Sequence, residues 1–268
     1  MKLILMGTND FVVPIFEALR KKHDILSVFT RAPAPAGRKY ILTPSPVQVW
    51  AENNNLPVHN SIKEFVNQDA DFVVVMSYGV ILPDSVLAQG NCINIHPSDL
   101  PKYRGPSPIR SALKNGDTKS AVCIMKIVHD LDAGDVYMRR EFDIDINDTN
   151  ETVENKVDEI AIEMLDEFFA APEKYKPVAQ SGTPVISHKF LGSDEIIDWK
   201  KSPIEIHNLV RALGCGRTKI NGVDVKILET KIENDALQIL QIQPAGKKPM
   251  DWKSFVNGLR GAEIKYGE

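Results

Sequence analysis

Short apolar runs alternate with amphipathic segments over the first two thirds of the chain. The apolar runs predict strands at residues 2–6, 24–29, 71–76, 92–96, 119–128 and 136–142. Apolar positions recurring near every 3.6 residues predict helices at 11–22, 47–54, 106–113 and 149–169. Strands that alternate with helices indicate an α/β fold built on a largely parallel sheet.

The pattern changes after residue 170. Residues 171–183 are richer in Pro, Lys and Gly, which indicates a linker. A helix is predicted at 203–213 and short strands at 223–228 and 237–243. We therefore expect a large domain at residues 1–176, a linker at 177–199 and a smaller β domain at 200–268.

One long segment carries no predicted element. Residues 30–46 hold several Ala and Pro residues, Gly37 and the cations Arg31, Arg38 and Lys39. Long loops of this kind inside a compact domain are either functional or merely mobile surface, and composition alone leaves both open.

The composition is that of an ordinary globular protein, with 43% hydrophobic and 25% charged residues. The three cysteines are widely separated and form no CxxC pair, so they support neither a disulfide framework nor a thiolate zinc site. The first apolar run is too short for a signal peptide and no stretch approaches transmembrane length, so we expect a cytoplasmic protein that makes no membrane contact.

The net charge of −4 conceals an asymmetry. Residues 200–268 hold 12 Lys or Arg against 8 Asp or Glu, whereas residues 1–199 hold 20 against 28. A mildly basic terminal module fits a polyanionic partner, although a difference of this size is also common on ordinary surfaces.

The predicted strand that begins at Cys92 ends in two polar residues, Asn94 and His96. Residues two apart on a strand point to the same face, and Pro97 stops the strand nearby. The pair therefore lies at a carboxyl end, where open α/β sheets bind ligands. An amide and an imidazole together can stabilise an oxyanion, and the imidazole can also move a proton. A buried, hydrogen-bonded core histidine is the alternative.

Three carboxylates follow in a turn-like segment between two predicted strands, at Asp130, Asp132 and Asp135. A carboxylate is the group that fixes the tautomer of a catalytic imidazole and stabilises its charged form. The spacing does not choose among the three. No clustered His and Cys ligands are visible, so we expect no metal.

Two strings, NIHPSDLPKYRGPSPI and HDLDAGDVY, resemble the paired signatures of the folate-dependent formyltransferases. The resemblance implies a Rossmann-like catalytic domain and matches the family's catalytic Asn, His and Asp to Asn94, His96 and Asp132. It also implies 10-formyltetrahydrofolate as the formyl donor and direct transfer to a primary amine, without a covalent enzyme intermediate.

Further strings resemble one branch of that family, the methionyl-tRNA formyltransferases. They are GTNDFVVP at the start, the RPAGR-like loop at residues 30–46 and QPAGKKPM near the end of a shortened, OB-like carboxyl domain. The resemblance implies that the protein formylates initiator methionyl-tRNA for translation initiation, and we expect a monomer. Contacts to the tRNA are expected from Arg31, Arg38, Lys39, Lys247 and Lys248.

The resemblance also implies a folate site in the loop after residue 76 and in the His96 segment. The expected contacts are Tyr78, Gly79, Leu82, Pro97, Ser98, Leu100 and Pro101.

Three alternatives remain. A formyltransferase acting on a nucleotide-linked amino sugar would share the same Asn, His and Asp. A glycinamide ribonucleotide enzyme is disfavoured because its phosphate-binding Gly-Ser turn is absent after the first strand. A folate- or RNA-binding module without catalysis would not need the three residues together.

Overall fold

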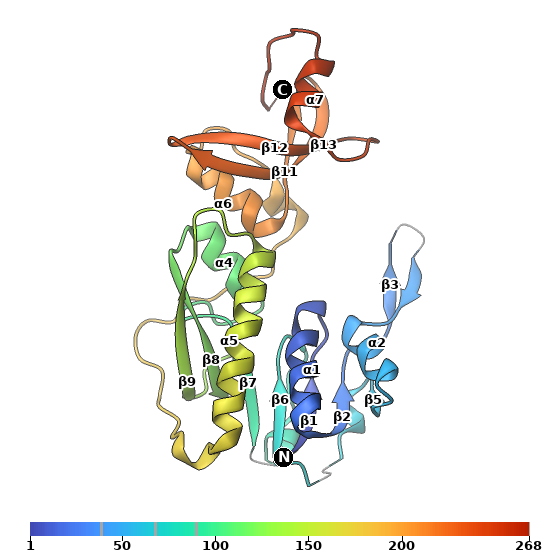
Figure 1. Ribbon diagram of the computed structural model, residues 1–268, viewed down its shortest axis with the longest axis vertical. Helices are drawn as coiled ribbons and strands as arrows, with labels where there is room; N and C mark the ends of the chain where they lie inside the picture. Colours follow the sequence, from blue (N-terminus) through green and yellow to red (C-terminus); the bar gives the residue numbers. More distant parts are fainter. Residues whose placement is uncertain (38–39, 67–68, 89–90, 268) are drawn as a thin grey trace. The chain divides into compact units, whose positions relative to one another are not determined.

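The computed structural model describes residues 1–37, 40–66, 69–88 and 91–267. It divides into two compact units (Figure 1). The first comprises Met1–Pro106, Ala121–Glu141 and Glu154–Ile186, and the second comprises Ser107–Ser120, Phe142–Val153 and Ser187–Glu268.

A seven-stranded sheet in the order β5-β2-β1-β6-β7-β8-β9 forms the centre of the first unit. Its strands are β1 (Lys2–Met6), β2 (Asp24–Phe29), β5 (Val58–His59), β6 (Phe72–Val75), β7 (Cys92–His96), β8 (Lys119–Lys126) and β9 (Val136–Asp143). Neighbours from β5 to β7 run parallel, and β8 runs antiparallel to β7. The predicted α/β fold is confirmed, with a mixed rather than fully parallel sheet.

Helices cover this sheet at α1 (Val13–Lys22), α2 (Pro46–Asn53), α3 (Asp84–Leu87) and α5 (Asn150–Ala170). The ends of α1 and α5 lie side by side on one face, where Lys22 and Asp166 are 2.5 Å apart (Figure 1). Phe168 of α5 packs edge-on against Phe72 at the start of β6. The amphipathic pattern of residues 149–169 thus corresponds to a helix packed on the sheet.

An apolar cluster that includes alternate residues of β1 and β6 fixes the position of the loop after β6. Ile4 and Met6 pack with Val73 and Val75, and the loop contributes Tyr78 and Leu82 to the same cluster. Because these two side chains are anchored in the core, the loop that follows the strand is held against the sheet.

The prediction that residues 30–46 carry no regular structure was wrong. A small antiparallel hairpin forms there from β3 (Ala34–Ala36) and β4 (Ile41–Thr43). All six strand residues are exposed, so the hairpin buries no apolar face. The hydrophobic pattern therefore contains no signal for it.

The second unit contains a four-stranded sheet in the order β10-β11-β12-β13. Its strands are β10 (Gly216–Ile220), β11 (Val223–Glu233), β12 (Ala236–Pro244) and β13 (Met250–Asp251), and its helices are α4 (Pro108–Asn115), α6 (Pro203–Leu213) and α7 (Trp252–Gly258). All neighbouring strands are antiparallel. The predicted small β module at the carboxyl end is confirmed.

The start of α6 shows why its bounds were predictable from the sequence. Ser202 accepts a hydrogen bond from the Glu205 backbone, and the Glu205 carboxylate accepts one from the Ser202 backbone. This reciprocal cap, with Pro203 in the first turn and Gly214 in the left-handed conformation after the last residue, defines both ends of the helix.

One buried carboxyl on α5 predicts a dependence of stability on pH. Asp158 is 7% exposed, and its Oδ1 has no hydrogen-bond partner within the described residues. Burial, together with the charges of Glu154 and Glu159, raises the pKa of Asp158 to about 7. The unfolded chain therefore loses this proton at a lower pH than the folded protein does, so the free energy of unfolding falls as the pH rises from about 4 to about 7.

The variant Asp158→Asn should remove this dependence. We expect it to be more stable than the parent by about 2 kcal/mol at pH 8, once the shift is reduced for solvent screening, and by much less at pH 4.5. Urea denaturation of both proteins across this pH range measures the difference. If the difference in the free energy of unfolding between the two proteins is the same at every pH, burial does not raise the pKa of Asp158 in the folded protein.

Candidate active site

The strand β7 places Asn94 and His96 on one face, as the alternation predicts. Asn94 lies opposite Val75 of β6 and Met125 of β8, whereas His96 lies opposite Cys123 of β8. His96 is 4% exposed and Asn94 is half-buried. The pair sits at the carboxyl end of a strand in the interior of the sheet.

The hydrogen bonding of His96 fixes its tautomer. Its Nε2 lies 3.0 Å from the carbonyl oxygen of Tyr103. A carbonyl oxygen can only accept, so Nε2 carries a proton and donates it. The other ring nitrogen, Nδ1, faces the Asp132 carboxylate with 3.7 Å between Nδ1 and Oδ2. Nδ1 is therefore the ring atom left for proton transfer or for donation to a ligand.

Asp132 completes the group. Its Oδ2 accepts a hydrogen bond of 2.8 Å from the Gly105 amide, and its Oδ1 lies 3.4 Å from Asn94 Nδ2. The carboxylate thus contacts both polar residues of β7 and the loop that follows them. The other two candidates do not join the group: Asp130 is 88% exposed beside His129, and Asp135 has no contact with His96 among the described residues.

The backbone around Asp132 is closely constrained. Asp132 itself has a positive φ of 47°. Two residues later, a Cβ at Gly134 would lie 1.9 Å from the carbonyl oxygen of Lys126, so no other residue fits without moving the backbone. The sequence string around Asp132 therefore encodes a turn that aims one carboxylate at β7.

Two side chains that the sequence analysis missed hold this turn. Gln180 donates from Nε2 to the carbonyl oxygens of Asp132 and Gly134, at 2.9 and 2.8 Å. Arg104 donates from Nε and Nη2 to Gln180 Oε1, at 3.0 and 2.7 Å. Gln180 lies in the segment assigned to a linker, where the sequence gives no sign of such a role.

The residues expected to contact folate differ in exposure. The side chains of Tyr78, Leu82 and Leu100 are buried, with 3, 6 and 5% exposed. Gly79 has a positive φ, and its carbonyl accepts a hydrogen bond from the Arg31 guanidinium. Burial raises the pKa of the Tyr78 hydroxyl. Exposed apolar surface on this loop comes instead from Val80 and Ile81, which the sequence analysis did not select.

The remaining expected folate contacts lie in the tight turn after β7, at Pro97, Ser98 and Pro101. Ser98 is fully buried, and its hydroxyl donates to the carbonyl of Lys102 at 2.6 Å. The Cys123 thiol packs on the Ser98 carbonyl at 3.2 Å. The Ser98 hydroxyl therefore stabilises the backbone of this turn.

The predicted tRNA contacts are dispersed. Arg31 is exposed and reaches the loop after β6, while Arg38 and Lys39 lie outside the described residues. Lys247 and Lys248 are exposed in the turn between β12 and β13 of the second unit.

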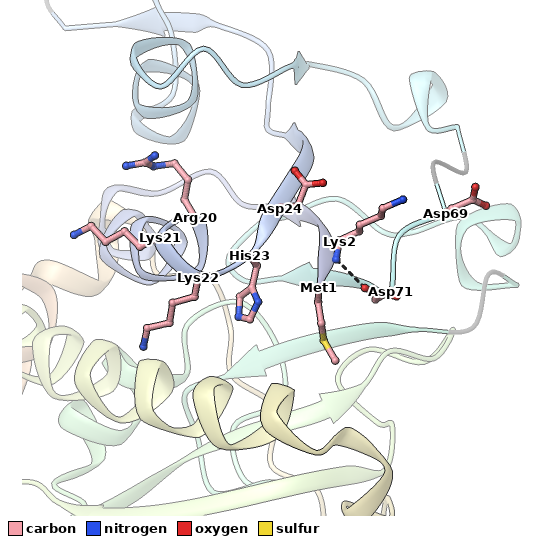
Figure 2. A pocket seen from close by; sticks show the side chains of 9 residues that line it. All are labelled: Met1, Lys2, Arg20, Lys21, Lys22, His23, Asp24, Asp69 and Asp71. Carbon is pink, nitrogen blue, oxygen red and sulfur yellow. Dashed lines mark hydrogen bonds between the residues drawn. The ribbon is translucent and has the colours of Figure 1, made fainter.

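A solvent-open hollow of about 600 Å³ lies beside the first residues of β1 and β2, at the amino ends of the parallel strands (Figure 2). Its cations come from Lys2 and from the end of α1, at Arg20, Lys21 and Lys22. The α1 cations are paired: Arg20 and Lys21 with Glu17, and Lys22 with Asp166. Cations at a helix end also interact favourably with the helix dipole, so we interpret this cluster as structural.

Among the residues that the structure describes, no three His, Cys, Asp or Glu side chains are grouped so that they could hold a metal ion. Within the same residues, none of the helices has the length and apolar character needed to cross a membrane.

Comparison with protein families matches residues 1–168 to the formyl transferase model and residues 192–236 to the formyl transferase carboxyl-terminal domain model. The methionyl-tRNA formyltransferase of Methylobacterium nodulans is 31% identical, covering 97% of each chain. That of Fusobacterium nucleatum is 36% identical, covering 87% of this chain and 81% of its own.

Solved structures share the fold. The sugar 3N-formyl transferase WlaRD, solved in the presence of dTDP and 5-N-formyl-THF, aligns with a TM-score of 0.66 at 22% identity, covering 87% of each chain. The methionyl-tRNA formyltransferase from Clostridium thermocellum aligns with a TM-score of 0.66 at 16% identity, covering 91% of this chain and 98% of its own.

Proposed function

Because the chain belongs to the formyl transferase family, whose members use a formyl-tetrahydrofolate donor, we propose that it transfers the formyl group of 10-formyltetrahydrofolate to the α-amino group of initiator methionyl-tRNA. The convergence of Asn94, His96 and Asp132 at the end of β7 carries the catalytic part of this proposal. The acceptor is inferred from the curated relatives, which match nearly the whole chain at 31–36% identity.

The proposed reaction needs a hydrogen-bond donor beside the formyl oxygen. The amine nitrogen attacks the formyl carbon, and the carbonyl electron pair moves onto oxygen. Asn94 Nδ2 donates to that oxyanion, and the imidazolium form of His96, which carries a proton on Nδ1 as well as on Nε2, provides a second donor. The intermediate then collapses, the folate nitrogen leaves with the bond pair, and it receives the proton that the amine gives up.

Asp132 has two roles in this scheme. Its carboxylate faces His96 Nδ1, so it orients the ring and favours the imidazolium form, in which Nδ1 also carries a proton. It also lies within reach of Asn94 Nδ2, which it holds at the same end of the strand. With Nε2 bound to Tyr103, the imidazole has little freedom to turn away.

The two domains would then have different roles. We propose that residues 1–176 carry the chemistry, that residues 177–199 connect, and that residues 200–268 form a shortened OB-like domain that contacts tRNA. The net positive charge of residues 200–268 and the exposed Lys247 and Lys248 support this role.

An acceptor assay tests the proposal. Purified protein is given labelled 10-formyltetrahydrofolate with initiator methionyl-tRNA, a dTDP-linked amino sugar or glycinamide ribonucleotide, each at equal concentration. We expect kcat/KM for the tRNA to exceed that for either small acceptor by about a thousandfold or more. Preference for the amino sugar would show that the acceptor is a nucleotide-linked amino sugar and not the tRNA. The sugar enzyme and the tRNA enzyme align with this chain at equal TM-scores, so the fold does not distinguish the two acceptors.

Formylation of tRNA should also depend on salt. Removing one cation that binds a phosphate reduces the slope of log(kcat/KM) against log[salt] by about 1. We therefore expect Arg38→Ala to lower kcat/KM about tenfold at low salt and to flatten the slope. The matched control is Lys174→Ala, which removes an exposed cation of the first unit. Insensitivity to both salt and Arg38→Ala would rule out the proposed contact of this loop with tRNA.

A further inference from the structure

We propose that Gln180 is a positioning residue for the catalytic carboxylate. It acts through Asp132 and does not touch the substrate. This inference rests on the proposed function of the same site, because it assumes that Asp132 takes part in formyl transfer.

The first argument is the geometry of the Gln180 amide. One nitrogen donates to two carbonyl oxygens that flank the same turn, those of Asp132 and Gly134, at 2.9 and 2.8 Å. An amide nitrogen has two protons, and both are used here. Gln180 thereby fixes the backbone on both sides of Ala133, directly beside the carboxylate that faces His96.

The second argument is that the turn needs external support. Asp132 has a positive φ of 47°, a conformation that costs free energy for a residue other than glycine. Within the part of the chain that the structure describes, its own side chain accepts one short hydrogen bond, 2.8 Å from the Gly105 amide. The two bonds from Gln180 therefore contribute directly to keeping the residue in this conformation.

The third argument is that Gln180 is itself oriented. Asparagine and glutamine amides can rotate by half a turn and exchange their oxygen and nitrogen. Arg104 prevents this, because its Nε and Nη2 both donate to Oε1 at 3.0 and 2.7 Å, and a guanidinium cannot accept. The nitrogen must then face the two carbonyl oxygens.

The fourth argument connects Gln180 to the other side of the site. Arg104 directly precedes Gly105, whose amide donates to Asp132 Oδ2. The Arg104 amide donates to the carbonyl of Val185, and Arg104 forms a bridge with Ile186. The segment that contains Gln180 thus joins the loop after β7 to the turn of Asp132, so both partners of the His96 ring are held by one hydrogen-bonded network.

The test uses two substitutions at this position in the full chain. Gln180→Glu keeps the length and an oxygen for Arg104 but places a carboxylate oxygen against the carbonyls of Asp132 and Gly134. Gln180→Met keeps the approximate volume and removes both bonds. Gln241→Glu, at an exposed position of β12, is the control for the same chemical change.

We expect both Gln180 variants to lower kcat for formyl transfer about 10- to 100-fold, by analogy with the range typical of groups that orient the ligands of a metal site. KM for the donor and for the acceptor should change less than about threefold, and Gln241→Glu should match the parent. Exchange of the Gly105 amide hydrogen should be faster in Gln180→Glu, because its acceptor moves.

Two results would overturn the proposal: an unchanged kcat in folded Gln180→Glu and Gln180→Met, or a lowered kcat with no change in Gly105 exchange. If the parent protein itself transfers no formyl group, the proposed function fails. The positioning of Asp132 by Gln180 is then decided by the Gly105 exchange rate alone, which must still rise in Gln180→Glu.

Discussion

Alanine in place of His96 is expected to lower formyl transfer about a thousandfold. The substitution removes the proposed Nδ1 donor to the oxyanion, and loss of one oxyanion donor costs about 3–4 kcal/mol. It also removes the imidazole that the proposed scheme uses for proton transfer. The measurement is the single-turnover rate with labelled 10-formyltetrahydrofolate and saturating initiator methionyl-tRNA.

Its control is His129→Ala. His129 lies three residues before Asp132 but has a side chain that is 82% exposed, so its loss should leave the rate within about twofold of the parent. Circular dichroism and the thermal midpoint establish that each variant is folded. A His96→Ala protein that is folded and retains the parental rate would show that the imidazole is a structural core residue.

Asparagine in place of Asp132 is expected to lower kcat about a thousandfold, with little loss of stability. The shape is retained, and an amide oxygen can still accept from the Gly105 amide, which donates 2.8 Å from Oδ2. The negative charge beside His96 Nδ1 is lost, and removing the charge that supports a catalytic imidazole costs as much as about 10⁴ in kcat in a well-studied triad.

The matched substitution is Asp130→Asn, which removes the same charge two residues earlier from a side chain that is 88% exposed. We expect parental kcat from this control. Equal effects of the two substitutions would mean that the charge of the whole turn matters and that Asp132 holds no special position.

The strand that carries the site could be predicted because local rules determine it. Apolar runs located β1 and β2 at their observed bounds, and simple alternation placed Asn94 and His96 on one face of β7. A capping sequence did the same for α6. These features depend on residues within a few positions of one another, where the sequence pattern is informative.

The partners of the site could not be predicted by the same rules. Asp132 was one of three carboxylates until the resemblance selected it, because its contacts with His96 and Asn94 join positions 36 and 38 residues apart. The bonds from Gln180 join residues 46 and 48 positions apart. Long-range polar contacts of this kind leave no periodic trace in the sequence.

The hairpin of β3 and β4 was missed for a different reason. Its strands are only three residues long and fully exposed, and Pro35 occupies the middle of the first. Proline is confined to edge positions in sheets and normally argues against a strand. The pairing therefore does not depend on the burial of an apolar face.

The most direct test is to follow the labelled formyl group itself. Parent protein is incubated with labelled 10-formyltetrahydrofolate and initiator methionyl-tRNA, and the amino acid is then released from the tRNA by mild base. We predict labelled N-formylmethionine from the parent, and background label from a variant that combines Asn94→Ala, His96→Ala and Asp132→Asn. Unlabelled methionine from the parent, or undiminished label from the folded triple variant, would contradict a formyl-transfer centre built from these three side chains.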